Sequence, residues 1–239
     1  MQRLIEPELL DSLPPDDPRA IRSRKDLRRV NMWMGNPGII AEQLTANLNG
    51  SLPRRILDIG AGDGSLMLRA VSRIAERWKA RAGELSGAGR ISLLDLQPVV
   101  SNDTLSSFKT AGWDCSILRA DILEWLKQPA SEQFDVIIAN LFLHHFSDVQ
   151  LRELLRALAE RVSLFIAVEP RRWRWAFIFS HLVGFIGCSS VTRHDAVVSV
   201  CAGFAGQELS KLWPAGGEWS LEERPANWCS HLFIAKRTC

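Results

Sequence analysis

Three glycines and two aspartates are crowded into the stretch RILDIGAGDGS, which runs from Arg55 to Ser65. Gly60, Gly62 and Gly64 follow a short apolar run and precede a helical pattern, which is the setting of a nucleotide-binding turn. The dinucleotide fingerprint G-x-G-x-x-G/A does not fit, because here the third glycine comes one residue early. The turn therefore predicts a nucleotide-like ligand without deciding which one.

Two carboxylates narrow the chemistry of that ligand. Asp58 and Asp63 belong to the same turn, and they would oppose a pyrophosphate at the N-terminus of the following helix. They would attract a sulfonium and an ammonium group, the two cations that S-adenosylmethionine carries. Glycine also lets the backbone approach such a ligand closely. We therefore expect S-adenosylmethionine as the cofactor, with S-adenosylhomocysteine as its product, rather than NAD.

Two further acids end the next two predicted strands. Asp95 ends ISLLDL, where its carboxylate can accept hydrogen bonds from both ribose hydroxyls. Asp121 follows CSILRA, beside the expected position of the adenine amino group. The separation of 37 residues between Asp58 and Asp95 exceeds the usual spacing of about 20. Most of the excess falls in a loop insertion predicted over 79–90.

Alternating strands and helices must position these residues. Short runs that are apolar on both faces, separated by helical patterns, predict a parallel sheet covered on both sides. The tail segments EWSLEERP and SHLFIAKR are joined by a short loop and are expected to pair antiparallel. The fold class is therefore α/β, with a doubly wound sheet. The predicted strands are RILDIG, ISLLDL, CSILRA, FDVIIANLF and SLFIAVE, and the helical patterns cover about 65–78, 99–111, 121–127 and 148–161.

In order along the chain, LDIGAGDGS, LLDLQP, RADILEWL and FDVIIANLFLHHFSD resemble the motifs of class I S-adenosylmethionine-dependent methyltransferases. The resemblance covers about 55–170 and implies a Rossmann-like sheet of seven strands, mostly parallel, with the last strand antiparallel. It also implies an N-terminal arm and helical lid over 1–50, and a methyltransferase domain over 51–239 with acceptor-pocket helices at about 170–212. The cofactor-binding residues that it implies are Asp58, Gly60, Gly62, Asp63, Gly64, Asp95, Leu96, Asp121, Ile122 and Asn140.

The predicted lid contains a strongly basic helix. Six basic residues and one acid between Arg19 and Arg29 give a local charge of +5, against +2 for the whole chain. A solvated helix face, a cover over an anionic group and a contact with anionic lipid would each explain this charge. As a cover, Arg28 or Arg29 would meet the methionine carboxylate of the cofactor. A second helix is expected from about 38 to 48, ending at the C-cap signal Asn49-Gly50.

Histidines mark the acceptor side of the predicted site. His144 and His145 directly follow the fourth strand, and imidazole has the pKa needed to take a proton from a phenol or enol. The alternative is local packing, with Asp148 as the cap of the next helix. His194 is a third candidate base, and Asp195 beside it is expected near the N-terminus of its helix.

No metal is expected at this site. Adjacent histidines chelate poorly, and the fourth strand ends in Asn140 where a magnesium site would need a carboxylate. Methylation of adenine N6 is also disfavoured, because Leu-Phe-Leu follows Asn140 in place of Pro-Pro and an aromatic residue.

The apolar stretch WAFIFSHLVGFIGC, residues 175–188, predicts one side of an acceptor pocket or a core helix, and it is too short to cross a bilayer. The lead DLRRVNMWMGNP and the segment VTRHDAVVSV resemble bacterial small-molecule methyltransferases of secondary metabolism. We expect methyl transfer to a small, largely apolar acceptor, aromatic or lipid-like, with a phenolic or enolic oxygen favoured. N- or C-methylation, action on protein or RNA, and a catalytically silent cofactor-binding module remain alternatives.

Composition limits the setting in which the protein works. Five scattered cysteines without a C-x-x-C pair favour reduced thiols and a cytoplasmic location. The N-terminus does not resemble a signal peptide, and the small net charge gives no reason to expect a nucleic-acid partner. Contact with a membrane surface, and the choice between monomer and homodimer, stay open.

Overall fold

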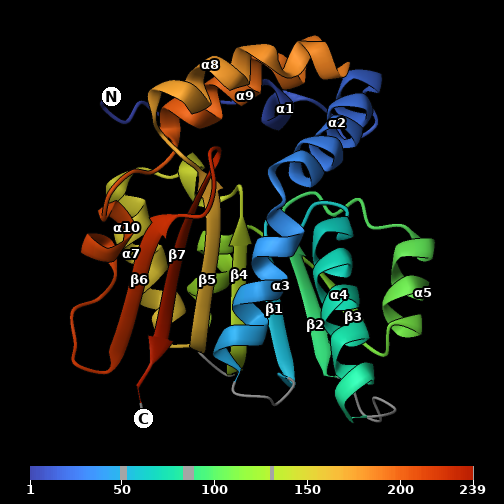
Figure 1. Ribbon diagram of the computed structural model, residues 1–239, viewed down its shortest axis with the longest axis vertical. Helices are drawn as coiled ribbons and strands as arrows, with labels where there is room; N and C mark the ends of the chain where they lie inside the picture. The colour runs from blue at the N-terminus through green and yellow to red at the C-terminus, as the bar shows by residue number, and fades with distance from the viewer. Residues whose placement is uncertain (49–52, 83–88, 130–131, 239) are drawn as a thin grey trace.

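A single sheet organises the protein. The computed structural model describes residues 1–48, 53–82, 89–129 and 132–238, and in these residues seven strands follow the order β3-β2-β1-β4-β5-β7-β6 (Figure 1). Strand β7 is antiparallel to both of its neighbours, and the other pairs are parallel, which confirms the predicted sheet. The strands are β1 (Arg55–Ile59), β2 (Arg90–Asp95), β3 (Asp114–Arg119), β4 (Phe134–Asn140), β5 (Val162–Pro170), β6 (Trp219–Pro225) and β7 (Ser230–Arg237).

The helices agree with the predicted patterns within a few residues. The helix α4 continues to Ala82, so the insertion predicted over 79–90 begins later than expected. Its part at 83–88 lies outside the described residues, and so does the C-cap signal Asn49-Gly50. The helices are α1 (Leu9–Ser12), α2 (Pro18–Met34), α3 (Asn36–Asn47), α4 (Ser65–Ala82), α5 (Asn102–Thr110), α6 (Ile122–Leu126), α7 (Asp148–Ala159), α8 (Arg174–Leu182), α9 (Ser190–Ala202) and α10 (Glu208–Leu212), with the 3-10 turns η1 (Leu143–His145) and η2 (Val183–Ile186).

Both faces of the sheet are covered by apolar helix faces. In β1, Ile56 packs into a cluster with α3 and α4, whereas Leu57 packs into the opposite cluster with α7 and α10. Successive side chains of a strand point to opposite faces, so a strand covered on both sides must be apolar throughout. This is the physical reason for the unbroken apolar runs in the sequence.

A second layer of helices lies above the carboxyl ends of the strands (Figure 1). It consists of α1 and α2 from the N-terminal region and α8 and α9 from the C-terminal half, with α9 packed against the other three. The helix α3 instead packs on the sheet, where Ile40 and Leu44 are fully buried. Whether the upper layer closes as a lid, and whether residue 50 is a boundary, remain predictions.

Candidate active site

The glycine turn leads from β1 into α4. Gly60, Gly62 and Gly64 have φ angles of 70°, 56° and 72°, a region that L side chains seldom adopt. A Cβ atom at Gly60 would collide with the ring of Phe142, whereas at Gly62 it would meet no described atom within 4 Å. Gly62 therefore borders open space, which fits a ligand that lies along the backbone of the turn.

Asp58 is a buried carboxylate without a compensating charge. Its side chain is 3% exposed, and within the described part of the chain it has no hydrogen-bond or ion-pair partner. Burial, together with the nearby charge of Asp95, raises its pKa to about 8. A cationic group in front of the turn would stabilise the ionised form, which is what the ammonium and sulfonium of S-adenosylmethionine would provide.

The acids of the next two strands reach the same edge of the sheet. Asp95 accepts hydrogen bonds from the backbone N–H groups of Gly62 at 2.8 Å and Gln97 at 2.7 Å, so it links the end of β2 to the glycine turn. Asp121 caps α6 by accepting the N–H of Leu123 at 2.7 Å. Of the two apolar candidates, Leu96 is exposed and Ile122 is buried. The structure therefore gathers the predicted cofactor residues along β3, β2 and β1.

Asp63 contacts the basic helix instead of facing a free ligand site. Its carboxylate accepts hydrogen bonds from Arg28 Nη1 at 2.5 Å and from the N–H of Ser65 at 3.0 Å. Although burial would raise the pKa of Asp63, these two partners lower it below its usual value. Arg29 pairs with Asp26 at 3.1 Å. Both arginines that were expected to meet the methionine carboxylate thus have protein carboxylates as partners in this structure.

Asn140 joins the end of β4 to the N-terminal helices. Its amide nitrogen donates to Asn31 Oδ1 at 3.0 Å, and its oxygen accepts from Asn36 at 2.9 Å. The next residue, Leu141, has a φ of 50°, which is uncommon for a residue with a side chain and concentrates at functional sites. This junction places Asn140 between the glycine turn and the cavity that Leu141 helps to line.

An apolar cavity lies between the upper helices and the strand ends. Its volume is about 80 Å³, within a larger recess that is open to solvent. Helix α2 contributes Leu27, Val30 and Trp33 to one side. The other side is formed mainly by α8 and α9, which fall within the segment predicted to form the acceptor pocket. Its polar lining consists of Glu8, Ser23, Ser180, Thr192, Asp195 and Ser199.

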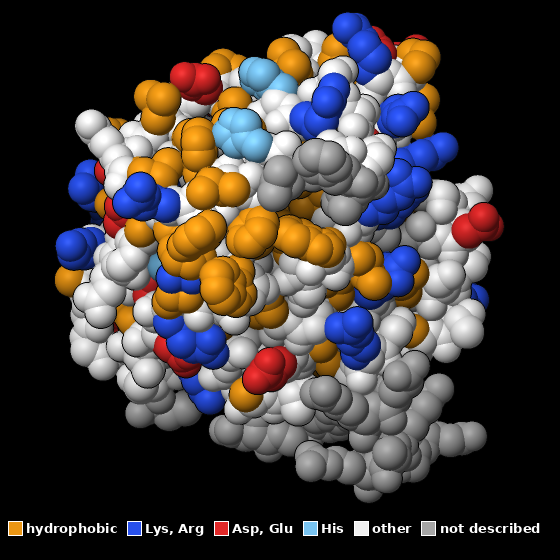
Figure 2. All heavy atoms as spheres, turned by 45° about the horizontal axis from the view of Figure 1, so that its top comes forward, with side chains coloured by type: hydrophobic (Ala, Val, Ile, Leu, Met, Phe, Trp, Pro, Cys, Tyr) orange, Lys and Arg blue, Asp and Glu red, His pale blue; other side chains and the backbone are white. Residues whose placement is uncertain are grey.

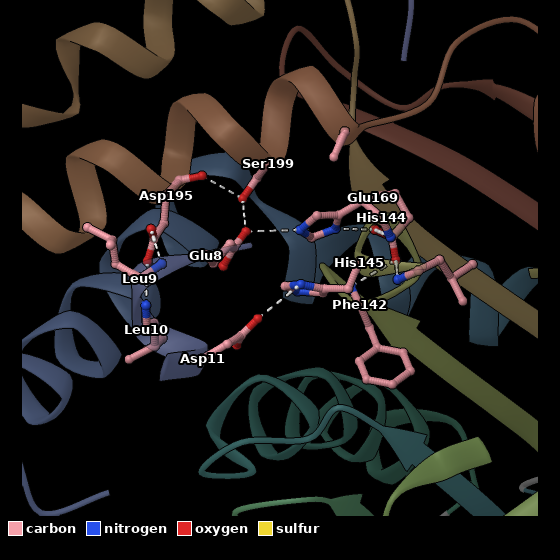
Figure 3. Close-up of polar contacts among 12 residues, drawn as sticks. Glu8, Leu9, Leu10, Asp11, Phe142, His144, His145, Glu169, Asp195 and Ser199 are labelled. Atoms are coloured by element: carbon pink, nitrogen blue, oxygen red, sulfur yellow. Dashed lines mark hydrogen bonds and ion pairs between the residues drawn. The ribbon is translucent and has the colours of Figure 1, made fainter. Parts of the chain in front are cut away.

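His144 lies between two carboxylates beside this cavity (Figure 3). Its Nδ1 is 2.8 Å from Glu169 Oε2, and its Nε2 is 3.2 Å from Glu8 Oε1. Burial alone would lower the pKa of His144, but the hydrogen bonds to Glu169 and Glu8 raise it to about 9. Burial alone would raise the pKa of Glu8, but the hydrogen bond to His144 lowers it to about 2. At neutral pH the ring is therefore an imidazolium between two carboxylates.

Glu169 positions the loop that carries His144. It is fully buried at the end of β5 and accepts the N–H groups of Phe142 at 3.0 Å and Leu143 at 2.8 Å. One carboxylate thus fixes both the backbone of η1 and the orientation of the imidazole.

Glu8 reaches the site from the N-terminal arm. The hydroxyl of Ser199 in α9 donates to Glu8, and Arg3 anchors the arm by contacting Asp148 at 2.7 Å. Asp195 accepts the N–H groups of Leu9 at 2.8 Å and Leu10 at 3.0 Å (Figure 3). The expectation that Asp195 serves its own helix was wrong: it caps α1, whereas Ser189 caps α9.

Asp148 is likewise not the cap of its helix. The side chain of Ser147 accepts the N–H of Gln150, and the Gln150 side chain accepts the N–H of Ser147, forming a capping box at the start of α7. Asp148 is the first helical residue, and its carboxylate faces Arg3. The Asp148 carboxylate, which the sequence predicted to cap the helix, therefore binds Arg3 of the N-terminal arm instead.

The other two histidines are placed differently from His144. The ring of His145 stacks on that of His144 with a centroid distance of 4.3 Å, and its Nδ1 is 3.4 Å from Asp11 Oδ2. His194 is 48% exposed at its side chain and contacts Asp195 at 3.0 Å. Neither His194 nor His144 is among the described residues that line the cavity, but His144 is the buried one of the two and is held between Glu8 and Glu169.

Glu8, His144 and His145 place potential metal-ligand atoms within 4.8 Å of one another. Both ring nitrogens of His144 already face carboxylates, and its raised pKa retains a proton that a metal ion would have to displace. We therefore keep the prediction that the site works without a metal.

Two residues of this site were not recognised from the sequence. Glu169 was visible as the one acid in the fifth apolar run, and a charge in a strand that is otherwise buried is a usable signal. Glu8 is 136 residues from His144 in a proline-rich arm, and no local pattern could have paired them.

The fold and this edge of the sheet resemble those of class I S-adenosylmethionine-dependent methyltransferases. Residues 56–163 match a family model described as a methyltransferase domain. The matched segment contains the glycine turn, Asp95, Asp121, Asn140 and both adjacent histidines. The cofactor expected from the carboxylates is therefore that of the family.

Solved structures share this fold at low sequence identity. An O-methyltransferase family protein from Burkholderia thailandensis has a TM-score of 0.59 at 14% identity, over 93% of this chain and 61% of its own. The mitomycin 7-O-methyltransferase has a TM-score of 0.55 at 19% identity, over 96% and 60%. A magnesium protoporphyrin IX methyltransferase from Synechocystis PCC 6803, with bound S-adenosylhomocysteine, has a TM-score of 0.52 at 12% identity, over 90% and 86%.

This chain thus spans about three fifths of the length of the first two similar proteins. No curated protein matches its sequence significantly. Within the described ranges, every helix is too short or too polar to cross a membrane.

Proposed function

We propose that this methyltransferase transfers the methyl group of S-adenosylmethionine to a phenolic or enolic hydroxyl of a small, largely apolar acceptor. The observation that carries the proposal is the apolar cavity, whose polar lining includes Glu8 in contact with His144. An apolar site with few polar groups orients an aromatic or lipid-like molecule by one hydroxyl. The similar fold of the mitomycin 7-O-methyltransferase adds support for oxygen as the acceptor atom.

We assign a role to each predicted cofactor residue from its position relative to the glycine turn. Asp58 and the turn would hold the cationic methionine end, and Asp95 would bind the ribose hydroxyls. The adenine would lie near Asp121, with Leu96 and Ile122 as apolar neighbours. The cofactor supplies a methyl group already activated on a sulfonium, so the protein must mainly position the acceptor and exclude water.

Glu8 and His144 would handle the acceptor proton. Glu8 lines the cavity, so its carboxylate can accept a hydrogen bond from the acceptor hydroxyl. As the O–CH₃ bond forms and the C–S bond breaks, the hydroxyl proton would pass to the Glu8 carboxylate, because both ring nitrogens of His144 already carry protons at neutral pH. Glu169 holds the ring of His144 so that its Nε2 faces Glu8, and the charge of the imidazolium would stabilise the developing oxyanion.

Two variants separate cofactor binding from chemistry. Asp95→Ala should weaken cofactor binding in calorimetry, and unchanged affinity would remove its ribose role. His144→Ala should lower turnover by about 10²–10⁴ while cofactor affinity stays near that of the wild type. Turnover is followed by mass spectrometry on a panel of phenols, enols and amines. N- or C-methylated products would replace the oxygen assignment, and cofactor binding without any product would favour a silent binding module.

A further inference from the structure

Exposed apolar side chains gather on the face of the molecule that Figure 2 shows. We call Trp33, Trp175, Ile178 and Trp228 the apolar rim; they are 55%, 52%, 46% and 63% exposed. Trp33 also lines the cavity. Trp175 and Ile178 are three residues apart in α8 and therefore share one helix face. Large apolar side chains gathered on an exposed surface mark a site of interaction.

Ring contacts link two of the rim residues to neighbouring aromatic side chains. Trp33 contacts Phe179 of α8 with a centroid distance of 6.4 Å. On the other side, Trp228 contacts Trp173 at 5.7 Å, and the Trp173 indole N–H donates to the backbone oxygen of Trp228. Aromatic pairs thus join α2 to α8, and the start of α8 to the β6–β7 loop.

Cations without ion-pair partners border this edge. Arg22, Lys25, Arg174 and Arg193 are exposed, and none pairs with an acid among the residues that the structure describes. Arg22 and Lys25 belong to α2, which also carries Trp33, and Arg174 directly precedes Trp175. Arg22 and Arg193 also line a hollow at the start of α9. Figure 2 shows Lys and Arg side chains on both sides of the central apolar patch.

This combination favours a lipid surface over a second copy of the chain. Tryptophan and arginine together are typical of side chains at a bilayer interface. A second copy docked through the same face would bring the same unpaired cations together, which is unfavourable. Anionic headgroups would neutralise them, while the bilayer interior would receive the exposed indole and Ile178.

We propose that the apolar rim and its flanking cations dock the protein on an anionic membrane surface, with the cavity mouth turned toward the lipid. Uptake of an apolar acceptor from the bilayer is a consequence that rests on the proposed function, whereas docking itself does not. A water-insoluble acceptor could then reach the cavity without crossing bulk water, because the rim residue Trp33 is also part of the cavity lining.

Cosedimentation with vesicles tests the docking. The full chain should bind vesicles of phosphatidylglycerol and phosphatidylethanolamine, bind phosphatidylcholine vesicles much less, and dissociate as salt rises. The double variant Trp175→Ser with Ile178→Ser should lower partitioning by about tenfold or more. Arg22→Gln and Lys25→Gln should each lower it by about fivefold. The control Leu221→Ser, at an apolar position on β6 that is 40% exposed, should leave partitioning unchanged.

Several outcomes would overturn the docking. The first is that the wild type binds neither vesicle type, or binds both equally. The second is that the rim variants bind vesicles as well as the wild type does. The third is that light scattering shows self-association of the wild type, which the rim variants abolish. A thermal shift with S-adenosylhomocysteine checks that each variant folds, and the salt titration of the wild type needs no variant. Because none of these readouts uses turnover, a failure of the proposed methyl transfer would be seen separately.

Discussion

Replacing Glu169 with Gln removes one charge from the centre of the candidate site. Glutamine keeps the size of the side chain and an oxygen that can accept the Phe142 and Leu143 N–H groups. It loses the negative charge beside His144 Nδ1. The pKa of His144 should therefore fall, because burial, which lowers it, would be opposed by Glu8 alone.

The size of the effect follows from the raised pKa of His144. A rise from 6.5 to about 9, at about 1.4 kcal/mol for each pH unit, corresponds to about 3 kcal/mol of folding free energy. Glu169 is closer to the ring than Glu8, at 2.8 Å against 3.2 Å, so it should supply the larger part. We expect Glu169→Gln to lower the free energy of unfolding by about 2 kcal/mol, approaching the cost of breaking a buried ion pair.

The pH dependence has a definite sign. A histidine whose folded pKa is raised stabilises the protein fully below its unfolded pKa of 6.5, and this contribution is lost as pH rises through about 9. Urea unfolding should therefore show a clear gap between wild type and variant below pH 6.5. The gap should shrink above pH 9.

The chain offers a matched control in a second buried carboxylate. Glu223 lies 2.8 Å from His231 and accepts the N–H groups of Leu209 and Ser210, but it is not among the described residues of the cavity lining. Glu223→Gln should destabilise the protein and leave turnover intact, whereas Glu169→Gln should lower both. A stability gap for Glu169→Gln that does not change with pH, or equal turnover losses in the two variants, would refute the reasoning.

Two further predictions concern the cofactor and metal ions. Because the pKa of Asp58 is about 8 and a cationic ligand favours its ionised form, cofactor affinity measured by calorimetry should increase by up to about tenfold per pH unit toward pH 8. Asp58→Asn should bind more weakly and lack this dependence; a flat wild-type profile would contradict the assignment. Dialysis against a chelator should leave turnover unchanged, since His144 retains its proton, and activity restored by a divalent ion would instead identify a metal at Glu8, His144 and His145.

Several features of this site could be read directly from the sequence. Asp58, Asp95 and Asp121 each end a strand of a parallel sheet, and the carboxyl ends of such strands meet at one edge. Their proximity therefore follows from strand order and chain direction, which the apolar runs already indicate. The positive φ angles of the glycine turn are similarly local. The central strands were predictable from local sequence as well, because β1, β2, β4 and β5 show their two-sided burial in their own residues. The edge strands β3 and β6 are mostly not buried, and the total of seven strands was implied by the family resemblance.

The partners of long-range contacts could not be predicted in this way. Asp195 looked like a helix acid, yet it caps α1 from 186 residues away. Arg28 looked available to a ligand, yet it contacts Asp63 across 35 residues. In both cases the sequence indicated a charged side chain that needs a partner of opposite charge or a hydrogen-bond donor. Which group becomes that partner depends on how α2 and α9 pack above the sheet.

The sequence by itself determined the alternation of strands and helices, the glycine turn and the acids at the strand ends, because periodicity and strand ends are local properties. Only the tertiary structure brought Glu8 and Glu169 to the two nitrogens of His144 and enclosed an apolar cavity beside them. A histidine in a sequence has an ordinary pKa. Burial between two carboxylates from distant segments is what changes it, and burial exists only after the chain has folded.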